Sequence, residues 1–185
     1  MVRNFRLTTV YFIFFLGFQA HASNGCYLQS YINHNCFRFV APDFVNSAVG
    51  PCVPSDAYTI RESLKKKGYY FIVMNNTASK KCVHQFGNII GIGDITPYEC
   101  IENHSNLLWE IVPDNFGYFF NSGYFYIKAK HSGMCLGMNL RYTHGKFARH
   151  GLLIQRDCDS SDSLWRFTRP EEPNVSVDPF EACME

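Results

Sequence analysis

Histidine and cysteine side chains can bind metals, transfer protons or act as nucleophiles, and their spacing indicates which of these roles is open to them. Six histidines lie beyond residue 22, and none pairs with another at metal-ligand spacing: His34, His84, His104, His131, His144 and His150. The sequence has no G-x-S-x-G elbow, no H-E-x-x-H motif and no Walker loop. We therefore expect a protein that is not an enzyme, without a catalytic residue, metal or cofactor.

The cysteines indicate disulfide chemistry rather than catalysis. No C-x-x-C pair occurs, and the closest two cysteines are ten residues apart, which disfavours a redox pair or a zinc ribbon. An even number of cysteines in an exported chain is typical of disulfides, and it argues against a free cysteine nucleophile. The eight are Cys26, Cys36, Cys52, Cys82, Cys100, Cys135, Cys158 and Cys183.

The first 22 residues have the pattern of a secretory signal peptide. Arg3 and Arg6 precede the short apolar run of residues 10–18, and Ala20-His21-Ala22 has the small residues of a cleavage site. A membrane anchor is the alternative, but it would need about 20 apolar residues. The sequence predicts cleavage after Ala22 and a secreted or periplasmic protein.

Composition excludes several classes of protein. The 185 residues are 46% hydrophobic, 16% aromatic and 18% charged, which is unlike a disordered chain. The net charge is +1, and loss of Arg3 and Arg6 with the signal peptide would change it to −1, so we expect no nucleic-acid partner. We also expect no stable insertion into a membrane.

Two segments of the chain resemble each other and indicate an internal repeat. Each has an aromatic strand-like opening, a cysteine followed by an aliphatic residue, a second cysteine 18 or 23 residues later, and then Leu-Trp-x-apolar. They begin at Tyr70 and Tyr124. A third, more degenerate copy of the repeat begins near Tyr27 and has Tyr58 in place of tryptophan. The aromatic residue and the apolar residue two positions later would share one face and could meet around one axis: Tyr58/Ile60, Trp109/Ile111 and Trp165/Phe167.

Short apolar runs separated by turn residues predict an all-β protein, and the threefold repetition narrows it to a closed pseudo-threefold barrel. The best helical candidate is residues 58–67. Equivalent positions in the repeats predict equivalent disulfides: Cys36–Cys52, Cys82–Cys100 and Cys135–Cys158. Cys26 and Cys183 would then join the chain ends. We expect residues 170–185 to form an irregular tail, pinned only by that last bond.

The pattern resembles a ricin-type β-trefoil lectin domain, over residues 26–169. Residues 153–158 (LIQRDC) and 163–167 (SLWRF) are similar to the family's apolar-Gln-x-x-Cys and Gln-x-Trp ending. The resemblance implies an all-β, disulfide-stabilised β-trefoil of three degenerate repeats over residues 23–169. Two family features are missing. The signature glutamine is replaced in the three copies by Asp56, Leu107 and Ser163, and the sugar-binding aspartate by Arg38, His84 and Gly137.

A secreted, degenerate trefoil of this size resembles the A and C binding subunits of cytolethal distending toxins. The resemblance implies a non-catalytic subunit that recognises cell-surface glycans or glycoproteins. It also implies a catalytic toxin subunit and a sister trefoil subunit as partners. The lost motif residues favour an alternative, a non-lectin trefoil that acts as a protein-binding or inhibitor subunit.

In a trefoil, the ligand site would follow the first cysteine of a repeat. The last repeat offers Asn139 and Arg141 for hydroxyls or a carboxylate, and Tyr142 to stack on a sugar. The middle repeat offers His84, Gln85 and Asn88. An ordinary polar loop is the alternative in both. The aromatic hairpin over residues 116–126 is either core or an exposed patch for a protein partner.

Overall fold

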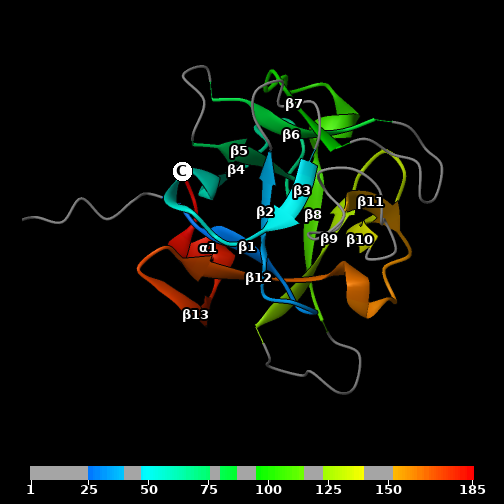
Figure 1. The fold of residues 1–185 in the computed structure, drawn as a ribbon. Helices are drawn as coiled ribbons and strands as arrows, with labels where there is room; N and C mark the ends of the chain where they lie inside the picture. The colour runs from blue at the N-terminus through cyan, green and yellow to red at the C-terminus, as the bar shows by residue number, and fades with distance from the viewer. Residues whose placement is uncertain (1–24, 40–46, 76–79, 87–94, 115–122, 140–151) are drawn as a thin grey trace, which may run out of the picture.

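A computed structural model describes residues 25–39, 47–75, 80–86, 95–114, 123–139 and 152–185, and within these ranges the chain is built mainly from short antiparallel strands (Figure 1). The strands follow the aromatic and β-branched runs of the sequence, which suit a pleated, half-buried surface. No helix of the described residues has the length and apolar character needed to cross a bilayer.

Each repeat contributes four strands and a short 3-10 turn before the fourth. The first repeat contains β1 (Tyr27–Ser30), β2 (Cys36–Phe39), β3 (Ser47–Gly50), η1 (Pro54–Asp56) and β4 (Tyr58–Glu62). The second contains β5 (Tyr70–Met74), β6 (Cys82–Gln85), β7 (Ile95–Tyr98), η2 (Ser105–Leu107) and β8 (Trp109–Pro113). The third contains β9 (Tyr124–Ala129), β10 (Cys135–Asn139), β11 (Leu152–Arg156), η4 (Ser161–Ser163) and β12 (Leu164–Arg169).

The first and fourth strands of the repeats form a ring. Ladders join β1 to β12, β12 to β9, β9 to β8, β8 to β5 and β5 to β4. The bridge between Cys26 and Tyr58 links the start of β1 to β4 and completes the circuit. Closure leaves the ring without a free edge. The prediction of an all-β, closed barrel with three related units is confirmed.

The second and third strands of each repeat form a hairpin, β2–β3, β6–β7 and β10–β11. The second strand begins with the first cysteine of the repeat, and a disulfide ties that cysteine to the segment that leads into the 3-10 turn. The bonds join the pairs that the repeat predicts: Cys36–Cys52, Cys82–Cys100, Cys135–Cys158 and, between the chain ends, Cys26–Cys183.

Three large aromatic side chains lie at the centre of the ring, one from the fourth strand of each repeat. Trp109 and Trp165 are fully buried, and Tyr58 nearly so. Their polar atoms donate to the backbone carbonyl directly after the first cysteine of the same repeat, at 3.0 Å for Trp109 and Val83, 2.8 Å for Trp165 and Leu136, and 3.4 Å for Tyr58 and Phe37. The alternate residues Ile60, Ile111 and Phe167 join the same core, as the repeat predicts.

Two local predictions are wrong. Residues 58–67 are not helical, because Tyr58–Glu62 forms β4 against β5 and buries its aromatic and β-branched side chains. Residues 170–185 are not irregular. Glu172–Val177 forms β13 against residues 167–169 of β12, beyond the residues of β12 that pair with β9, and Pro179–Ala182 forms the helical turn α1, capped by the Asp178 carboxylate. The strand forms because the end of β12 extends past its pairing with β9 and is free to pair there, which the tail sequence alone does not reveal.

Candidate functional site

One position recurs in the three hairpins and holds a different residue in each. The residue directly after the first cysteine of every repeat belongs to the core, so the next residue lies on the opposite face of its strand. The ricin-type resemblance associates this second position with sugar binding. It is Arg38 on β2, His84 on β6 and Gly137 on β10.

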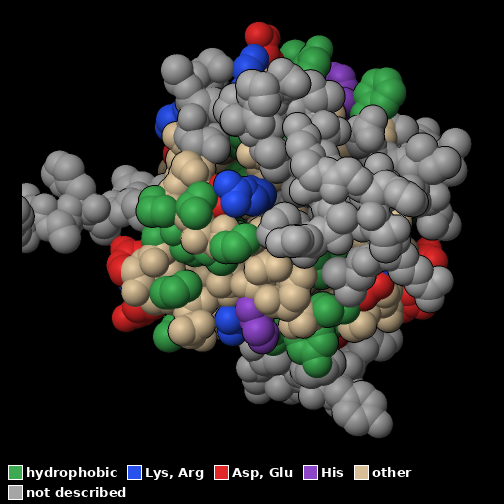
Figure 2. All heavy atoms as spheres, viewed as in Figure 1, with side chains coloured by type: hydrophobic (Ala, Val, Ile, Leu, Met, Phe, Trp, Pro, Cys, Tyr) green, Lys and Arg blue, Asp and Glu red, His purple; other side chains and the backbone are tan. Residues whose placement is uncertain are grey.

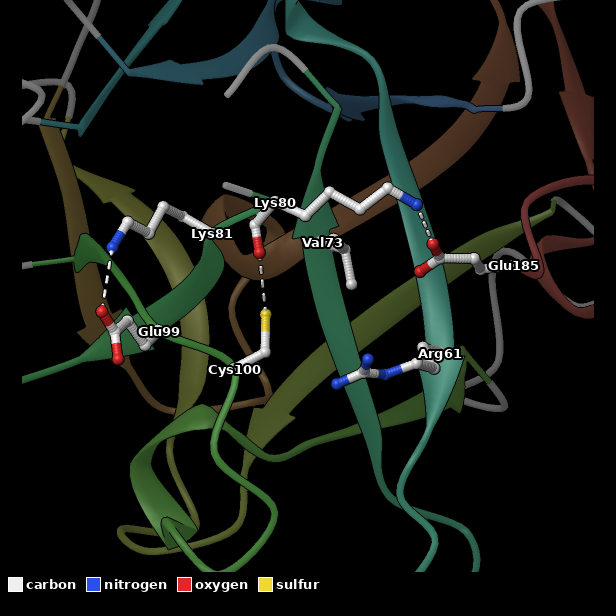
Figure 3. A pocket seen from close by; sticks show the side chains of 7 residues that line it. All are labelled: Arg61, Val73, Lys80, Lys81, Glu99, Cys100 and Glu185. Carbon is white, nitrogen blue, oxygen red and sulfur yellow. Dashed lines mark hydrogen bonds and ion pairs between the residues drawn. The ribbon is translucent and has the colours of Figure 1, made fainter. Parts of the chain in front are cut away.

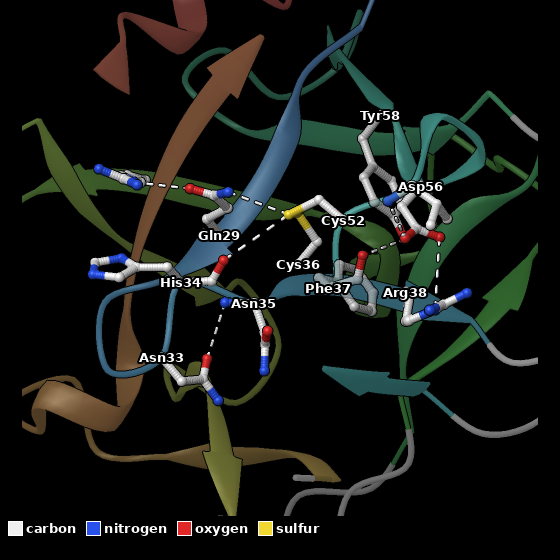
Figure 4. The surroundings of a disulfide bond; sticks show 12 residues. Gln29, Asn33, His34, Asn35, Cys36, Phe37, Arg38, Cys52, Asp56 and Tyr58 are labelled. Atoms are coloured by element: carbon white, nitrogen blue, oxygen red, sulfur yellow. Dashed lines mark hydrogen bonds and ion pairs between the residues drawn. A yellow bond between two sulfur atoms is a disulfide. The ribbon is translucent and has the colours of Figure 1, made fainter. Parts of the chain in front are cut away.

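In the first repeat this position is taken up by an internal ion pair. Nε of Arg38 lies 3.8 Å from Oδ1 of Asp56, which also accepts a hydrogen bond from the Val53 backbone N–H through Oδ2. Figure 4 shows the two side chains facing each other beside the Cys36–Cys52 disulfide. Burial raises the pKa of Asp56 to about 6, although Arg38 acts in the opposite direction. The two groups engage each other rather than a ligand.

In the third repeat the same space is filled by neighbouring side chains. A Cβ on Gly137 would lie 2.9 Å from Oγ of Ser163 and 2.9 Å from Cδ of Arg156, so the position has no room for a side chain. Arg156 donates to the Met138 carbonyl at 3.0 Å and to the Asp162 carboxylate at 2.6 Å. This part of the third hairpin is closed by its own polar network.

The middle repeat is different, because His84 lies among other rings. Its centroid is 5.1 Å from that of Tyr98, 5.2 Å from that of His104 and 6.2 Å from that of Phe86. Tyr98 and His104 are themselves 5.7 Å apart. The β6–β7 hairpin places Tyr98 at the end of β7 next to His84, and His104 enters from the residue before η2.

The His84 ring at the centre of this cluster carries no charge at neutral pH. Burial lowers the pKa of His84 to about 4, and nearby His104 and His131 act in the same direction. The ring is therefore neutral at pH 7, with one nitrogen that donates and one that accepts. Its Nδ1 lies 3.4 Å from the hydroxyl of Thr96. A neutral imidazole flanked by aromatic rings can contact an uncharged, hydroxylated ligand without an electrostatic penalty.

The rings around His84 are open to solvent. Phe86 is 66% exposed and Tyr98 44%, whereas His84 is 6% exposed. Ile101 is 43% exposed, and its backbone carbonyl accepts a hydrogen bond from the His104 N–H at 3.1 Å. We call these residues and His104 the middle-repeat patch. Figure 2 shows hydrophobic and histidine side chains together at the top of the molecule, where Figure 1 places β6 and β7. Exposed aromatic rings over a buried polar group are typical of a binding surface.

The structure places the sequence-predicted site residues unevenly. His84 is at the centre of the patch, but Gln85 is 1% exposed and its amide donates to Ser132 Oγ at 3.4 Å. Asn139 ends β10 and is half-buried. Asn88, Arg141 and Tyr142 lie outside the described residues. The ligand roles of these six residues stay predictions.

Sequence reasoning missed Phe86, Tyr98, Ile101 and His104. The signal that could have found Tyr98 is the hairpin register, which pairs His84 with Thr96 and Cys82 with Tyr98. His104 has no such signal, because it reaches the patch from a turn 20 residues farther along the chain. Among the described residues, no group of three or more histidines, cysteines or acids is arranged to hold a metal ion.

The second half of the predicted aromatic hairpin packs inward. Tyr124 contacts Tyr31 edge to face, with ring centroids 5.1 Å apart, and Phe125 contacts Phe167 in the core at 5.9 Å. Tyr126 is 7% exposed. For these three residues the core alternative holds; residues 116–120 lie outside the described residues.

No protein-family model and no curated protein matches the chain. Several solved structures do match the chain. The cytolethal distending toxin of Haemophilus ducreyi is 19% identical with a TM-score of 0.61, over 86% of this chain and 91% of that chain. SeviL, solved with the asialo-GM1 saccharide, is 15% identical with a TM-score of 0.57, over 79% and 98%. The BEL β-trefoil is 11% identical with a TM-score of 0.57, over 78% and 91%.

The chain is a β-trefoil. The predicted resemblance to trefoil proteins, including a cytolethal distending toxin subunit, is confirmed for the fold. A trefoil scaffold serves many functions, so the function has to be argued from the chemistry of the patch. The four disulfides are consistent with a location outside the cytosol.

Proposed function

We propose that this trefoil is a secreted, non-catalytic protein that binds cell-surface glycans through the middle-repeat patch. The observation that carries the proposal is the exposure of Phe86 and Tyr98 around the neutral, buried ring of His84. Aromatic faces pack against the apolar C–H face of a sugar ring, while imidazole and hydroxyl groups bond its hydroxyls. The equivalent positions in the other two repeats are taken up by internal contacts.

A glycan array tests this proposal. We expect the wild-type chain to bind a subset of neutral glycans, and the Phe86→Ala/Tyr98→Ala double variant to lose that binding by about tenfold or more. Leu64→Ala is the matched control, because Leu64 is 91% exposed and lies in the turn between β4 and β5. Equal binding by the double variant and the control would reject the patch.

The third repeat provides the competing site. Asn139, Arg141 and Tyr142 follow Cys135 along the chain, and their side chains suit a hydroxylated or acidic sugar. On the same array, Arg141→Ala/Tyr142→Ala should leave binding intact if the middle-repeat patch is the glycan site. Loss of binding in this variant alone would move the site to the third repeat.

The delivery of a toxin is the more specific form of the proposal. Its support is the similarity to the Haemophilus ducreyi toxin, together with a patch that includes the exposed aliphatic residue Ile101. In this form the chain joins a catalytic toxin subunit and a sister trefoil subunit and attaches the complex to host cells. Co-purification of the chain with a nuclease-like product of a neighbouring gene tests it, and elution of the chain alone would count against it.

A protein-binding or inhibitor subunit is the second candidate function. It is favoured by Asp56, Leu107 and Ser163, which stand where the ricin-type signature has glutamine. A silent glycan array combined with a stable complex on size-exclusion chromatography would select this candidate over the lectin. Peptide sequencing of the exported protein tests secretion separately, and we expect it to begin at Ser23, directly after the predicted cleavage site.

A further inference from the structure

A cavity lies apart from the middle-repeat patch, where the end of the chain runs beside β4. Its volume is about 360 Å³, and Figure 3 shows the side chains that surround it. Arg61 comes from β4 and Val73 from β5, and the remaining wall comes from the ends of the β6–β7 hairpin and the chain terminus: Lys80, Lys81, Glu99, Cys100 and Glu185. A volume of this size accommodates one monosaccharide unit.

The charged side chains of the cavity do not balance. Lys80 forms an ion pair with Glu185, and Nζ of Lys81 lies 3.7 Å from Oε1 of Glu99. Arg61 is the third cation, and no carboxylate of the described residues pairs with it. Arg61 is therefore the one cation among the side chains that line the cavity without a carboxylate partner.

Arg61 is held in place without being neutralised. Its guanidinium carbon lies over the Phe71 ring, 4.9 Å from the ring centre, in a cation–π contact that restrains the group. Its Nε is buried and has no hydrogen-bond partner. Figure 3 shows the guanidinium extending from β4 across β5 toward the Cys100 side of the cavity. A partly desolvated guanidinium in a fixed orientation is a strong receptor for an anion.

We propose that this cavity binds the carboxylate of an acidic sugar unit, with Arg61 as its anchor. A planar carboxylate matches the fork of a guanidinium, and one negative charge matches the single unpaired cation. Glu185 lines the same cavity, and its carboxylate oxygens can accept hydrogen bonds from sugar hydroxyls. This ligand differs from the neutral sugar proposed for the middle-repeat patch, so the proposal goes beyond that function.

Isothermal titration with free N-acetylneuraminic acid and with glucuronic acid tests the cavity, with galactose as the uncharged comparison. We expect saturable binding of at least one acid, and a loss of about tenfold or more in Arg61→Gln. Arg61→Lys keeps the charge but not the fork, so it should bind with intermediate affinity. Lys65→Gln is the control, because Lys65 lies in the exposed turn after β4.

Glu99→Gln gives a result of opposite sign that does not depend on the folding of an Arg61 variant. Glu99 is 75% exposed, so the substitution leaves the core untouched, and it removes one of the two carboxylates. We expect the acid to bind a few-fold more tightly. Weaker binding in Glu99→Gln, equal binding in Arg61→Gln and wild type, or no binding of either acid would overturn the proposal.

Inorganic phosphate and sulfate separate a carboxylate site from a general anion site. Tighter binding of either one than of both sugar acids would overturn the carboxylate assignment. The Phe86→Ala/Tyr98→Ala variant separates this proposal from the one above. It should bind the sugar acids as wild type does, even where it has lost binding to neutral glycans, and loss of acid binding in that variant would reject a separate site.

Discussion

Nε of Arg38 lies 3.8 Å from Oδ1 of Asp56, beyond the distance of a hydrogen bond, although the two groups carry opposite charges. The Asp56 side chain is 2% exposed and that of Arg38 is 30% exposed. Burial therefore outweighs attraction, and the pKa of Asp56 is raised from 3.8 to about 6. The fold favours the neutral form of this carboxyl, which is ionised at pH 7 at a cost in stability.

Asp56→Asn should stabilise the protein at neutral pH. The pKa of Asp56 is higher in the folded state than in the unfolded state. Its contribution to the free energy of unfolding is therefore fully present below the unfolded pKa of 3.8 and is lost as pH rises through about 6. Asparagine avoids that loss and can still accept from the Val53 N–H. We expect the free energy of unfolding in urea to rise by about 1–3 kcal/mol at pH 7.5, with no gain at pH 4. A less stable variant at pH 7.5 would mean that the ion pair is a net stabiliser.

His84 should have the opposite pH dependence. Its folded pKa of about 4 lies below the ordinary 6.5, so between these values the unfolded chain binds more protons and stability falls as pH falls. In the Asp56→Asn background, unfolding free energy should decrease from pH 7 to pH 4, by at most about 3 kcal/mol from this group. Adding His84→Gln should flatten the curve. An NMR titration of His84 with a midpoint near 6.5 would contradict the buried, neutral ring.

Most of the fold can be predicted from the positions of the cysteines and the two tryptophans in the sequence. Their fixed offsets predict the three disulfides within the repeats and the central aromatic residues, because equivalent positions of each repeat pack in the same way. The bond between Cys26 and Cys183 then follows as the remaining pair. The middle-repeat patch could not be predicted in the same way. Tyr98 reaches His84 only through the register of β6 and β7, and His104 through η2. The strand of residues 172–177 likewise depends on the end of β12, which extends past its pairing with β9.

The hydrogen bonds of the central aromatic residues predict that substitution lowers stability more in the third repeat, which has a tryptophan, than in the first, which has a tyrosine. Trp165→Phe removes the indole donor and leaves the buried Leu136 carbonyl without it, at a cost of about 2–4 kcal/mol. Tyr58→Phe loses only a 3.4 Å contact to Phe37, and we expect it to cost about 1 kcal/mol or less. Urea unfolding of both variants at pH 7.5 measures the difference. Equal losses of stability would mean that the hydrogen bond of Tyr58 stabilises the first repeat as much as that of Trp165 stabilises the third.

The Cys26–Cys183 bond should be the most stabilising of the four disulfides. It closes a loop with a sequence separation of 157, against 16 for Cys36–Cys52. In the loop-entropy model these loops are worth about 5 and about 3 kcal/mol. We expect Cys26→Ala/Cys183→Ala to lose more stability in urea than Cys36→Ala/Cys52→Ala.

The two cysteine variants should also differ in where the structure loosens. Cys183 is followed by the Met184 bridge to Ile60 in β4, and Pro179–Ala182 packs Phe180 against Tyr70 with ring centroids 5.2 Å apart. Without its disulfide, the tail keeps these contacts, the ion pair between Lys80 and Glu185 and the β13 ladder. Amide hydrogen exchange should therefore accelerate over residues 172–185 in Cys26→Ala/Cys183→Ala and stay slow there in Cys36→Ala/Cys52→Ala. Unchanged protection in the first variant would show that β13 and α1 hold the tail without the bond.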